Sequence, residues 1–348
     1  MRHLEAPSLE EIRAARERLV GVALRTPLVR LAVDDAPAEI YLKLENLQPI
    51  GSFKLRGAAN AMRLAGPAQL AAGVYTASAG NMAQGVAWSA RQIGVAATVV
   101  MPDHAPATKL EAVERLGGRI VKVSFDRWWQ VLIEHRYPGL SGLFIHPVAD
   151  RAVMAGNGTI ALEILEDLPE LDAVLVPYGG GGLSCGIAAA LRALKPEVRI
   201  IGVEVETAAP LAASLAAGEP RTVAYRASFV DGIGGKGMME EMWPLAQRLL
   251  DGSRVVSLPE VAAAVRLLAE RNHVVAEGAG AVPLAAALAE PELGSKVVCI
   301  VSGGNLDAST LAAILSGKTP LRRCRRLVRD KRGRPDVRRS PVLRSRAA

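Results

Sequence analysis

Short apolar runs alternate with longer amphipathic segments along most of the chain. Segments such as residues 108–116, 159–168 and 183–194 are long enough to form helices. Strands that are apolar throughout and separated by helices are typical of parallel βαβ units, whose sheets are buried on both faces. The pattern therefore predicts an α/β fold with mainly parallel sheets. The expected strands are residues 41–45, 74–76, 97–101, 120–123, 143–145, 173–176, 199–203, 255–256 and 297–301.

Two serine–glutamate pairs mark the starts of helices. Ser8 is followed three residues later by Glu11, and Ser257 by Glu260, each before an apolar-periodic run. This spacing is that of a capping box, in which the two side chains satisfy free N–H groups reciprocally. We therefore expect helices after Ser8 and Ser257, the second reaching about residue 271.

The composition indicates a folded protein without a membrane span. Half of the 348 residues are apolar, and no apolar run approaches the ~18 residues that cross a bilayer. The first five residues lack an apolar core, so we expect no signal peptide. Cys185, Cys299 and Cys324 show no metal-binding or redox spacing, which fits a reducing cytoplasm.

The net charge of +7 comes from the C-terminal end. Residues 318–348 contain 13 Lys and Arg against 2 Asp and Glu, and the remainder of the chain has 29 basic against 33 acidic residues. A like-charged, proline-containing tract with little periodicity is predicted to be disordered. A basic tail can contact nucleic acid, but we favour a solvated extension.

Four consecutive glycines follow the expected strand at residues 173–176. Gly179, Gly180, Gly181 and Gly182 expose successive backbone N–H groups just before a predicted helix. Such a loop and the helix dipole together are typical of a phosphate site. A tight turn is the alternative, although one or two glycines suffice for that.

Two further loops carry polar groups at the carboxyl ends of strands, where α/β sheets bind their ligands. Residues 78–81 read Ser-Ala-Gly-Asn and suit a small carboxylate or a ring oxygen, and residues 302–305 read Ser-Gly-Gly-Asn. Taken alone, each could equally be a helix cap or a turn. If these loops hold a phosphate and a carboxylate, Lys54, between Gly51 and Gly57, becomes a candidate for imine chemistry.

Other functional classes match less well. Residues 232–237 satisfy G-x-G-x-x-G but follow no convincing strand, and Ser184 and Cys185 stand where the tetraglycine loop would need a third fingerprint glycine. A nicotinamide-dependent enzyme is thus a weaker alternative. The five histidines are scattered without metal-ligand spacing, and no G-x-S-x-G elbow of a hydrolase is present.

The lysine and the three loops, in this order, resemble the fold type II pyridoxal-phosphate enzymes. The nearest group is that of the threonine/serine ammonia-lyases (dehydratases) and serine racemase. The resemblance runs from about Thr26 to about Ser316 and includes residues 44–49, 155–163, 231–233 and 277–281. It implies two domains, each with a mainly parallel sheet flanked by helices.

The resemblance assigns a role to each site residue. Lys54 would bind pyridoxal phosphate as an imine and then act as the base, with Phe53 beside the ring. The tetraglycine loop would hold the phosphate, Asn81 would contact the ring hydroxyl oxygen, and Ser302 would face the pyridine nitrogen. Ser78 and the backbone of Ala79, Gly80, Asn81 and Met82 would take the substrate carboxylate. The cofactor site would also include Leu183, Gly232 and Glu277.

Several positions depart from the family pattern. Ala79 replaces the second serine of serine racemases, which favours elimination over racemisation. Met82 replaces a common histidine, which bears on substrate preference. Glu204 matches a divalent-cation ligand, but Pro210 stands where an aspartate would complete that site, so we expect no metal. We expect Arg127 to be solvated rather than to contact substrate. No regulatory domain is expected, because the basic tail begins where one would start.

We therefore predict a pyridoxal-phosphate-dependent lyase with a large domain (1–66 and 150–317), a small domain (67–149) and a tail (318–348). The expected reaction removes water from L-threonine or L-serine and gives a 2-keto acid and ammonia. Alternatives are a lyase for 3-hydroxyaspartate or a phenylserine-like substrate, a serine racemase, a β-replacement enzyme and a non-catalytic homologue. We expect a cytoplasmic homodimer.

Overall fold

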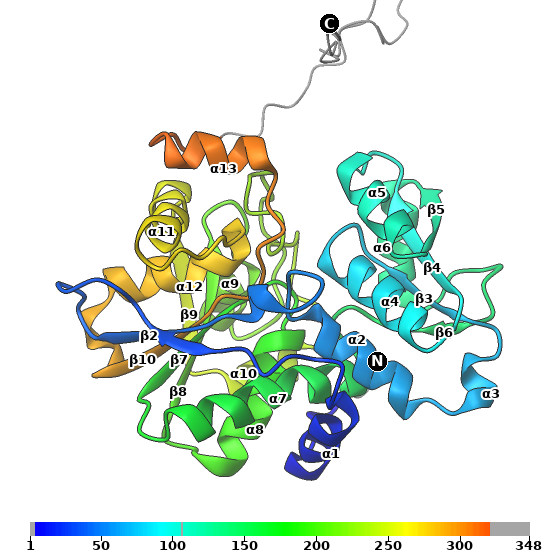
Figure 1. The fold of residues 1–348 in the computed structure, drawn as a ribbon, viewed down its shortest axis with the longest axis horizontal. Helices are drawn as coiled ribbons and strands as arrows, with labels where there is room; N and C mark the ends of the chain where they lie inside the picture. The colour runs from blue at the N-terminus through cyan, green and yellow to red at the C-terminus, as the bar shows by residue number, and fades with distance from the viewer. Residues whose placement is uncertain (1–3, 106, 321–348) are drawn as a thin grey trace, which may run out of the picture.

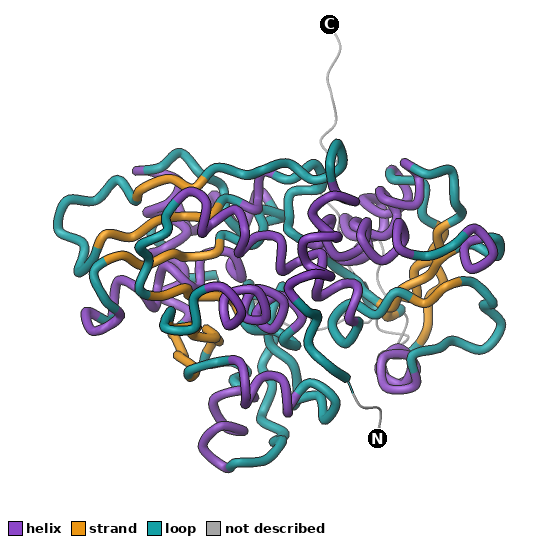
Figure 2. Tube along the Cα trace, turned by 90° about the horizontal axis from the view of Figure 1, so that it is seen from below, coloured by secondary structure: helices purple, strands orange, loops and turns teal. Residues whose placement is uncertain are grey.

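The computed structural model describes residues 4–105 and 107–320, and in it the chain builds two sheets that are flanked by helices (Figure 1). Seen from below in Figure 2, the strands gather at two opposite sides of the molecule, with helices between them. The predicted α/β class with mainly parallel sheets is confirmed. Most of the basic tail lies outside the described residues.

The larger sheet has six strands in the order β1-β2-β10-β7-β8-β9. All neighbours are parallel except β1 and β2, which pair antiparallel. The apolar pattern did not predict β1, because it has three residues and none of them is fully buried. The strands are β1 (Leu28–Arg30), β2 (Glu39–Lys43), β7 (Ala173–Pro177), β8 (Arg199–Val205), β9 (Gly252–Val256) and β10 (Lys296–Ile300).

The smaller sheet has four strands in the order β5-β4-β3-β6, and every neighbouring pair is parallel. We call this sheet and its helices the four-stranded half, and the rest the six-stranded half. The four-stranded half occupies the right of Figure 1. Its elements are α3 (Pro67–Leu70), β3 (Val74–Ala77), α4 (Asn81–Gln92), β4 (Ala97–Pro102), α5 (Ala107–Arg115), β5 (Arg119–Val123), α6 (Phe125–Glu134) and β6 (Leu143–Phe144).

Helices cover both faces of the six-stranded sheet. One core contains residues of α1, α7, α8 and α10, and the other contains residues of α11 and α12. The two capping boxes are present, at the starts of α1 and α11. The helices of this half are α1 (Leu9–Leu19), α2 (Lys54–Leu64), α7 (Arg151–Asp167), α8 (Gly182–Leu194), α9 (Pro210–Ala217), α10 (Trp243–Leu249), α11 (Leu258–Arg271), α12 (Gly278–Ala289) and α13 (Ala308–Leu315), with 3-10 turns η1 (Glu45–Leu47) and η2 (Pro291–Leu293).

Several predicted boundaries were wrong, and two of them have a clear local cause. The strand expected to reach residue 45 ends at Lys43, because η1 begins at Glu45. The helix expected from residue 159 begins at Arg151, because the Asp150 carboxylate accepts hydrogen bonds from Ala152 N and Val153 N and caps the helix there. Among the described residues, no helix combines the length and apolarity needed to cross a bilayer.

Helix α2 lies where the two halves meet, packed against α7 on one side and α4 on the other. Glycines allow both contacts, because a Cβ at Gly156 of α7 would lie 2.4 Å from Arg56 O, and one at Gly85 of α4 would lie 3.1 Å from Lys54 O. Both halves therefore pack directly against the first turns of α2, which carry Lys54.

Candidate active site

Lys54 is the first residue of α2, and its amine is held against the chain that joins the two halves. Lys54 Nζ donates a 2.8 Å hydrogen bond to Pro147 O and lies 5.1 Å from the centroid of the Phe53 ring. Burial lowers the pKa of Lys54 to about 8, although the Glu277 carboxylate acts in the opposite direction. An amine with this pKa is partly neutral near physiological pH, as a nucleophile or a base must be.

The tetraglycine loop connects β7 to α8 and leaves its donors free. None of the N–H groups from Gly179 to Ser184 has a hydrogen-bond partner within the described chain. A Cβ at Gly180 would lie 2.8 Å from the Val148 side chain, and one at Gly182 would lie 2.9 Å from Val148 O. Unpaired N–H groups at the start of a helix form an anion site that a side chain would close. The predicted role in holding phosphate fits this geometry.

A polar cluster forms around the Glu277 carboxylate and includes Asn81, Gly232 and the loop after β10. Asn81 Nδ2 donates to Glu277 Oε1 at 2.7 Å, and Asn305 Nδ2 donates to Asn81 Oδ1 at 2.8 Å. A Cβ at Gly232 would lie 3.1 Å from Glu277 Oε1, and one at Gly303 would lie 2.6 Å from it. The structure thus brings together residues that the sequence places in separate motifs.

Glu277 is the acidic group of this cluster. Burial raises its pKa to about 7, and the neighbouring Asp231 carboxylate adds to the shift, while the hydrogen bond from Asn81 opposes it. Ser302 joins the same region, because its carbonyl accepts a 3.0 Å hydrogen bond from Phe53 N. The loop after β10 is therefore attached directly to the residue that precedes Lys54.

The loop of residues 78–82 offers a second set of donors. The N–H groups of Ala79, Asn81 and Met82 have no hydrogen-bond partner among the residues described, and Ser78 Oγ accepts from Gly80 N at 3.2 Å. The Met82 side chain, however, is 1% exposed and packs in the core of the four-stranded half. Met82 therefore offers its N–H group to a ligand, while its side chain packs in the core.

The positions of Leu183 and Arg127 are explained by packing within the chain. Leu183 is buried in the first turn of α8, directly after the glycines. The guanidinium of Arg127, on α6, lies 5.6 Å from the ring centroid of Tyr137 in the same half. This contact accounts for Arg127 without a ligand.

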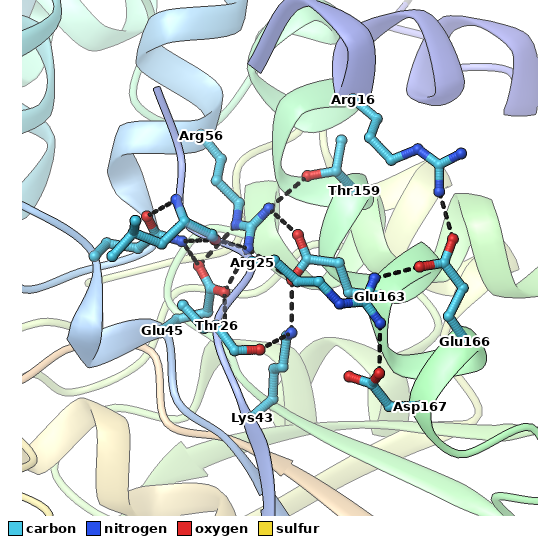
Figure 3. A network of polar contacts seen from close by, with 12 residues as sticks. Arg16, Arg25, Thr26, Lys43, Glu45, Arg56, Thr159, Glu163, Glu166 and Asp167 are labelled. Atoms are coloured by element: carbon cyan, nitrogen blue, oxygen red, sulfur yellow. Dashed lines mark hydrogen bonds and ion pairs between the residues drawn. The ribbon is translucent and has the colours of Figure 1, made fainter. Parts of the chain in front are cut away.

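A buried network of charges, missed by the sequence reasoning, holds α2 in place (Figure 3). Arg56 donates two hydrogen bonds of 2.8 Å to Glu45 and bonds of 2.6 and 2.9 Å to Glu163 of α7. Lys43 Nζ donates to Glu163 Oε2 and to Thr26 O, each at 2.6 Å. Two cations and two carboxylates thus balance, and they tie α2 to β2, η1 and α7.

Glu204, the residue matched to a cation ligand, is satisfied by neutral donors. Its carboxylate accepts hydrogen bonds from Leu211 N and Ala212 N, each at 2.8 Å, and from Ser253 Oγ at 2.9 Å. Pro210 starts α9, so the carboxylate sits at the N-terminus of that helix. These donors account for both carboxylate oxygens of Glu204, and the absence of a cation here stays a prediction.

Comparison with known proteins connects this geometry to a family. The model of a family described as "Pyridoxal-phosphate dependent enzyme" matches residues 21–303. An L-threonine ammonia-lyase of Thermotoga maritima is 40% identical over 314 residues, which cover 89% of this chain and 78% of that protein. Another, from Geobacter sulfurreducens, is 44% identical over 280 residues, covering 79% of this chain and 69% of the relative.

A solved structure gives the same result. The structure of maize serine racemase superposes with a TM-score of 0.82 at 34% identity and covers 90% of this chain and 98% of that one. The free N–H groups of residues 179–184 fit the phosphate of the cofactor, and the Lys54 amine, whose pKa burial lowers to about 8, fits its aldehyde. This chain belongs to the family of pyridoxal-phosphate-dependent enzymes.

Proposed function

We propose that this enzyme is an ammonia-lyase that removes water from L-threonine or L-serine and releases a 2-keto acid and ammonia. The observation that carries the proposal is the Lys54 amine, with a pKa of about 8, in a site where the neighbouring loop carries Ala79 and no second serine. The names of the Thermotoga maritima and Geobacter sulfurreducens relatives support the same reaction. The family match decides against a nicotinamide-dependent enzyme.

The residues of the site have separate roles in the proposed reaction. Bound pyridoxal phosphate supplies the electron sink for bond breaking at the α-carbon of the amino acid. Lys54 Nζ, aimed by the Pro147 carbonyl, takes the α-proton in its neutral form. The N–H groups of residues 179–184 hold the phosphate dianion, and those of Ala79, Asn81 and Met82 hold the substrate carboxylate.

Ala79 supports elimination over racemisation. Racemisation needs a proton donor and acceptor on each face of the α-carbon, and a methyl group can serve as neither. With Lys54 as the base of one face, removal of the α-proton leads to loss of the β-hydroxyl. The alternatives within the family are a lyase for a larger or acidic β-hydroxy amino acid and a β-replacement enzyme.

A substrate panel tests the proposal. Purified enzyme is offered L-threonine, L-serine, D-serine, 3-hydroxyaspartate and phenylserine, and both 2-keto acid release and the chirality of the remaining amino acid are measured. We expect keto acid from L-threonine or L-serine and no D-serine formed from L-serine. Turnover of only 3-hydroxyaspartate or phenylserine would move the assignment to the alternative lyases, and rapid interconversion of the serines would overturn the role of Ala79.

We also propose the domain bounds, assembly and location expected from the sequence. The four-stranded sheet falls within residues 67–149, which supports a small domain inserted into a large one of residues 1–66 and 150–317. Cys185 and Cys299 are free and buried, which supports a reducing cytoplasm. Limited proteolysis tests the domain bounds, and light scattering of the purified protein tests the homodimer. Cell fractionation tests the location.

A further inference from the structure

The short chain between β6 and α7 touches the lysine and the glycine loop with adjacent residues. Pro147 O accepts the hydrogen bond from Lys54 Nζ at 2.8 Å. The next residue, Val148, supplies the atoms nearest to a Cβ built at Gly180 or Gly182. A small shift of this turn would therefore move the partner of the amine and the wall of the glycine loop together.

The side chain of His146 holds this turn. His146 Nδ1 accepts hydrogen bonds from Val148 N at 3.0 Å and from Ala149 N at 2.7 Å. These are the residues two and three positions further on, the pattern in which an Asn or Asp side chain closes a turn. Because both donors are backbone N–H groups, Nδ1 must be the unprotonated nitrogen of the ring.

The other ring nitrogen attaches the turn to α6. His146 Nε2 lies 3.2 Å from Leu132 O, an acceptor, so Nε2 carries the proton. His146 is 2% exposed, and the His135 ring stacks on it with 4.4 Å between centroids. His135 Nε2 in turn lies 2.8 Å from Glu241 Oε1, in the six-stranded half. His146 is thus held in one tautomer and one orientation.

His135, His146 and Glu241 are close enough together to suggest a metal site, because one ligand atom of each lies within 4.8 Å of the others. The hydrogen bonds argue against it. The Nδ1 lone pair of His146 already accepts two N–H groups, and the two rings are stacked with 25° between their planes. In-plane lone pairs of stacked rings run side by side and do not converge on one ion.

We propose that His146 is a positioning residue for the cofactor site. Its Nδ1 closes the turn of residues 147–149, and the turn places Pro147 O against Lys54 Nζ and Val148 against the glycine loop. The role depends on the cofactor site, which the family match supports independently, and not on which amino acid is the substrate.

Three substitutions separate the two nitrogens of the ring. In His146→Asn, Oδ1 takes the place of Nδ1, so the acceptor for the turn is kept and the link to Leu132 O is lost. In His146→Gln, the terminal amide reaches toward Leu132 O, and the acceptor beside the backbone is lost. His146→Leu lacks both. His104→Leu is the matched control, since that side chain is 67% exposed on the same half.

Equilibrium binding of pyridoxal phosphate to each apoprotein, followed by its absorbance, is the first measurement, and kcat/KM is the second. We expect His146→Asn and His104→Leu to stay within about 3-fold of wild type in both. His146→Gln and His146→Leu should bind the cofactor about 10-fold more weakly, because one buried and one partly buried N–H group lose their acceptor. Their kcat/KM should fall about 10- to 100-fold as the amine is misplaced.

If the enzyme does not turn over the proposed substrates, the cofactor-binding measurement remains valid. The proposed function and the role of His146 are therefore tested separately. Equal behaviour of the Asn and Gln variants would overturn the proposal, whether both lose binding or both keep it. Where a variant melts far below wild type and cannot be assayed, ¹⁵N spectra of histidine-labelled wild-type enzyme decide. An unprotonated Nδ1 and a protonated Nε2 on His146 support the proposal, and the reverse tautomer overturns it.

Discussion

Two cations that lie two residues apart at the start of α2 have opposite surroundings. Arg56 is buried and shares its charge with Glu45 and Glu163 through close hydrogen bonds (Figure 3). Lys54 has only the neutral carbonyl of Pro147 as a hydrogen-bond partner within the described residues. Burial opposes the charge of both side chains, yet the carboxylates raise the pKa of Arg56, whereas the pKa of Lys54 falls to about 8.

This difference indicates that Arg56 stabilises the fold, whereas Lys54 takes part in the chemistry. A buried cation with two carboxylates stays charged and fixes the elements that carry its partners. A buried amine without a close carboxylate gives up its proton readily, as imine formation and proton transfer require. The charge network at Arg56 thus fixes the helix that carries Lys54, whose charged form is less stabilised than that of Arg56.

The largest effect is expected from removing the amine. Lys54→Ala should lower turnover by at least about 10⁴-fold, because the base and the covalent attachment of the cofactor are lost together. Keto acid release measures turnover, and borohydride should no longer trap the cofactor on the chain. Lys122→Ala, at an exposed position, is the control and should keep wild-type turnover. Full activity of the Lys54→Ala enzyme would show that a different residue is the base.

The next effect is expected on stability, from the other cation. Arg56→Met leaves Glu45 and Glu163 buried with Lys43 as their nearest remaining cation, and it should lower the free energy of unfolding by about 3–5 kcal/mol. Denaturant unfolding of the apoprotein gives the value. Arg56→Lys should recover little of the lost free energy of unfolding, because an ammonium group cannot make the bidentate hydrogen bonds of a guanidinium.

The control for Arg56 lies in the same close-up. Arg16 pairs with Glu166 at 2.5 Å, but both side chains are more than two-fifths exposed. Arg16→Met should change the free energy of unfolding by less than about 1 kcal/mol, because solvent screens an exposed pair. Equal losses in the two variants would mean that burial does not distinguish the network from a surface pair.

Local features of the sequence were enough to predict most of the fold. Strands such as β7 and β10 are apolar at nearly every position, and the capping boxes at Ser8 and Ser257 mark their helices without tertiary context. The antiparallel β1 was missed because three half-exposed residues carry no recognisable period. The start of α7 depended on Asp150, whose capping role the apolar pattern did not reveal.

The site was predictable only where its chemistry is local. Lys54 and the four glycines form motifs that can be recognised along the chain, and the structure brings their neighbourhoods together. The partner of Lys54 is a backbone carbonyl 93 residues away, and Arg56 meets Glu163 across 107 residues, so no local pattern shows either contact. The backbone N–H group of Met82 is free as predicted, but the helix turns its side chain into the core, which no local pattern showed.

A smaller effect should appear in the pH dependence of stability. The pKa of Glu277 is raised from an ordinary 4.5 to about 7, so between these values the folded state binds the proton more tightly than the unfolded state. The contribution of Glu277 is therefore fully present below about pH 4.5 and is lost as the pH rises through 7. Relative to Glu277→Gln, wild-type apoprotein should lose about 2–3 kcal/mol between pH 5 and 8.

Unfolding both proteins in denaturant at pH 5 and pH 8 measures the effect of this carboxyl, including its influence on the pKa of Lys54. The amide oxygen of Gln can still accept from Asn81 Nδ2, so the comparison changes the charge more than the contact. Parallel pH profiles would show that folding does not raise the pKa of Glu277.

The smallest effect is expected at Glu204, a buried carboxylate held by two N–H groups and a hydroxyl. Burial raises the pKa of Glu204, and these three donors oppose that shift without a cation. Chelators and added Mg²⁺, Ca²⁺ or Mn²⁺ should therefore leave kcat/KM and Tm unchanged. Pro210→Asp would add a second carboxylate at the start of α9, and that variant should be destabilised until a divalent cation restores its Tm. Cation-dependent activity of the wild-type enzyme would contradict this, because N–H donors would then not be a sufficient partner for a buried charge.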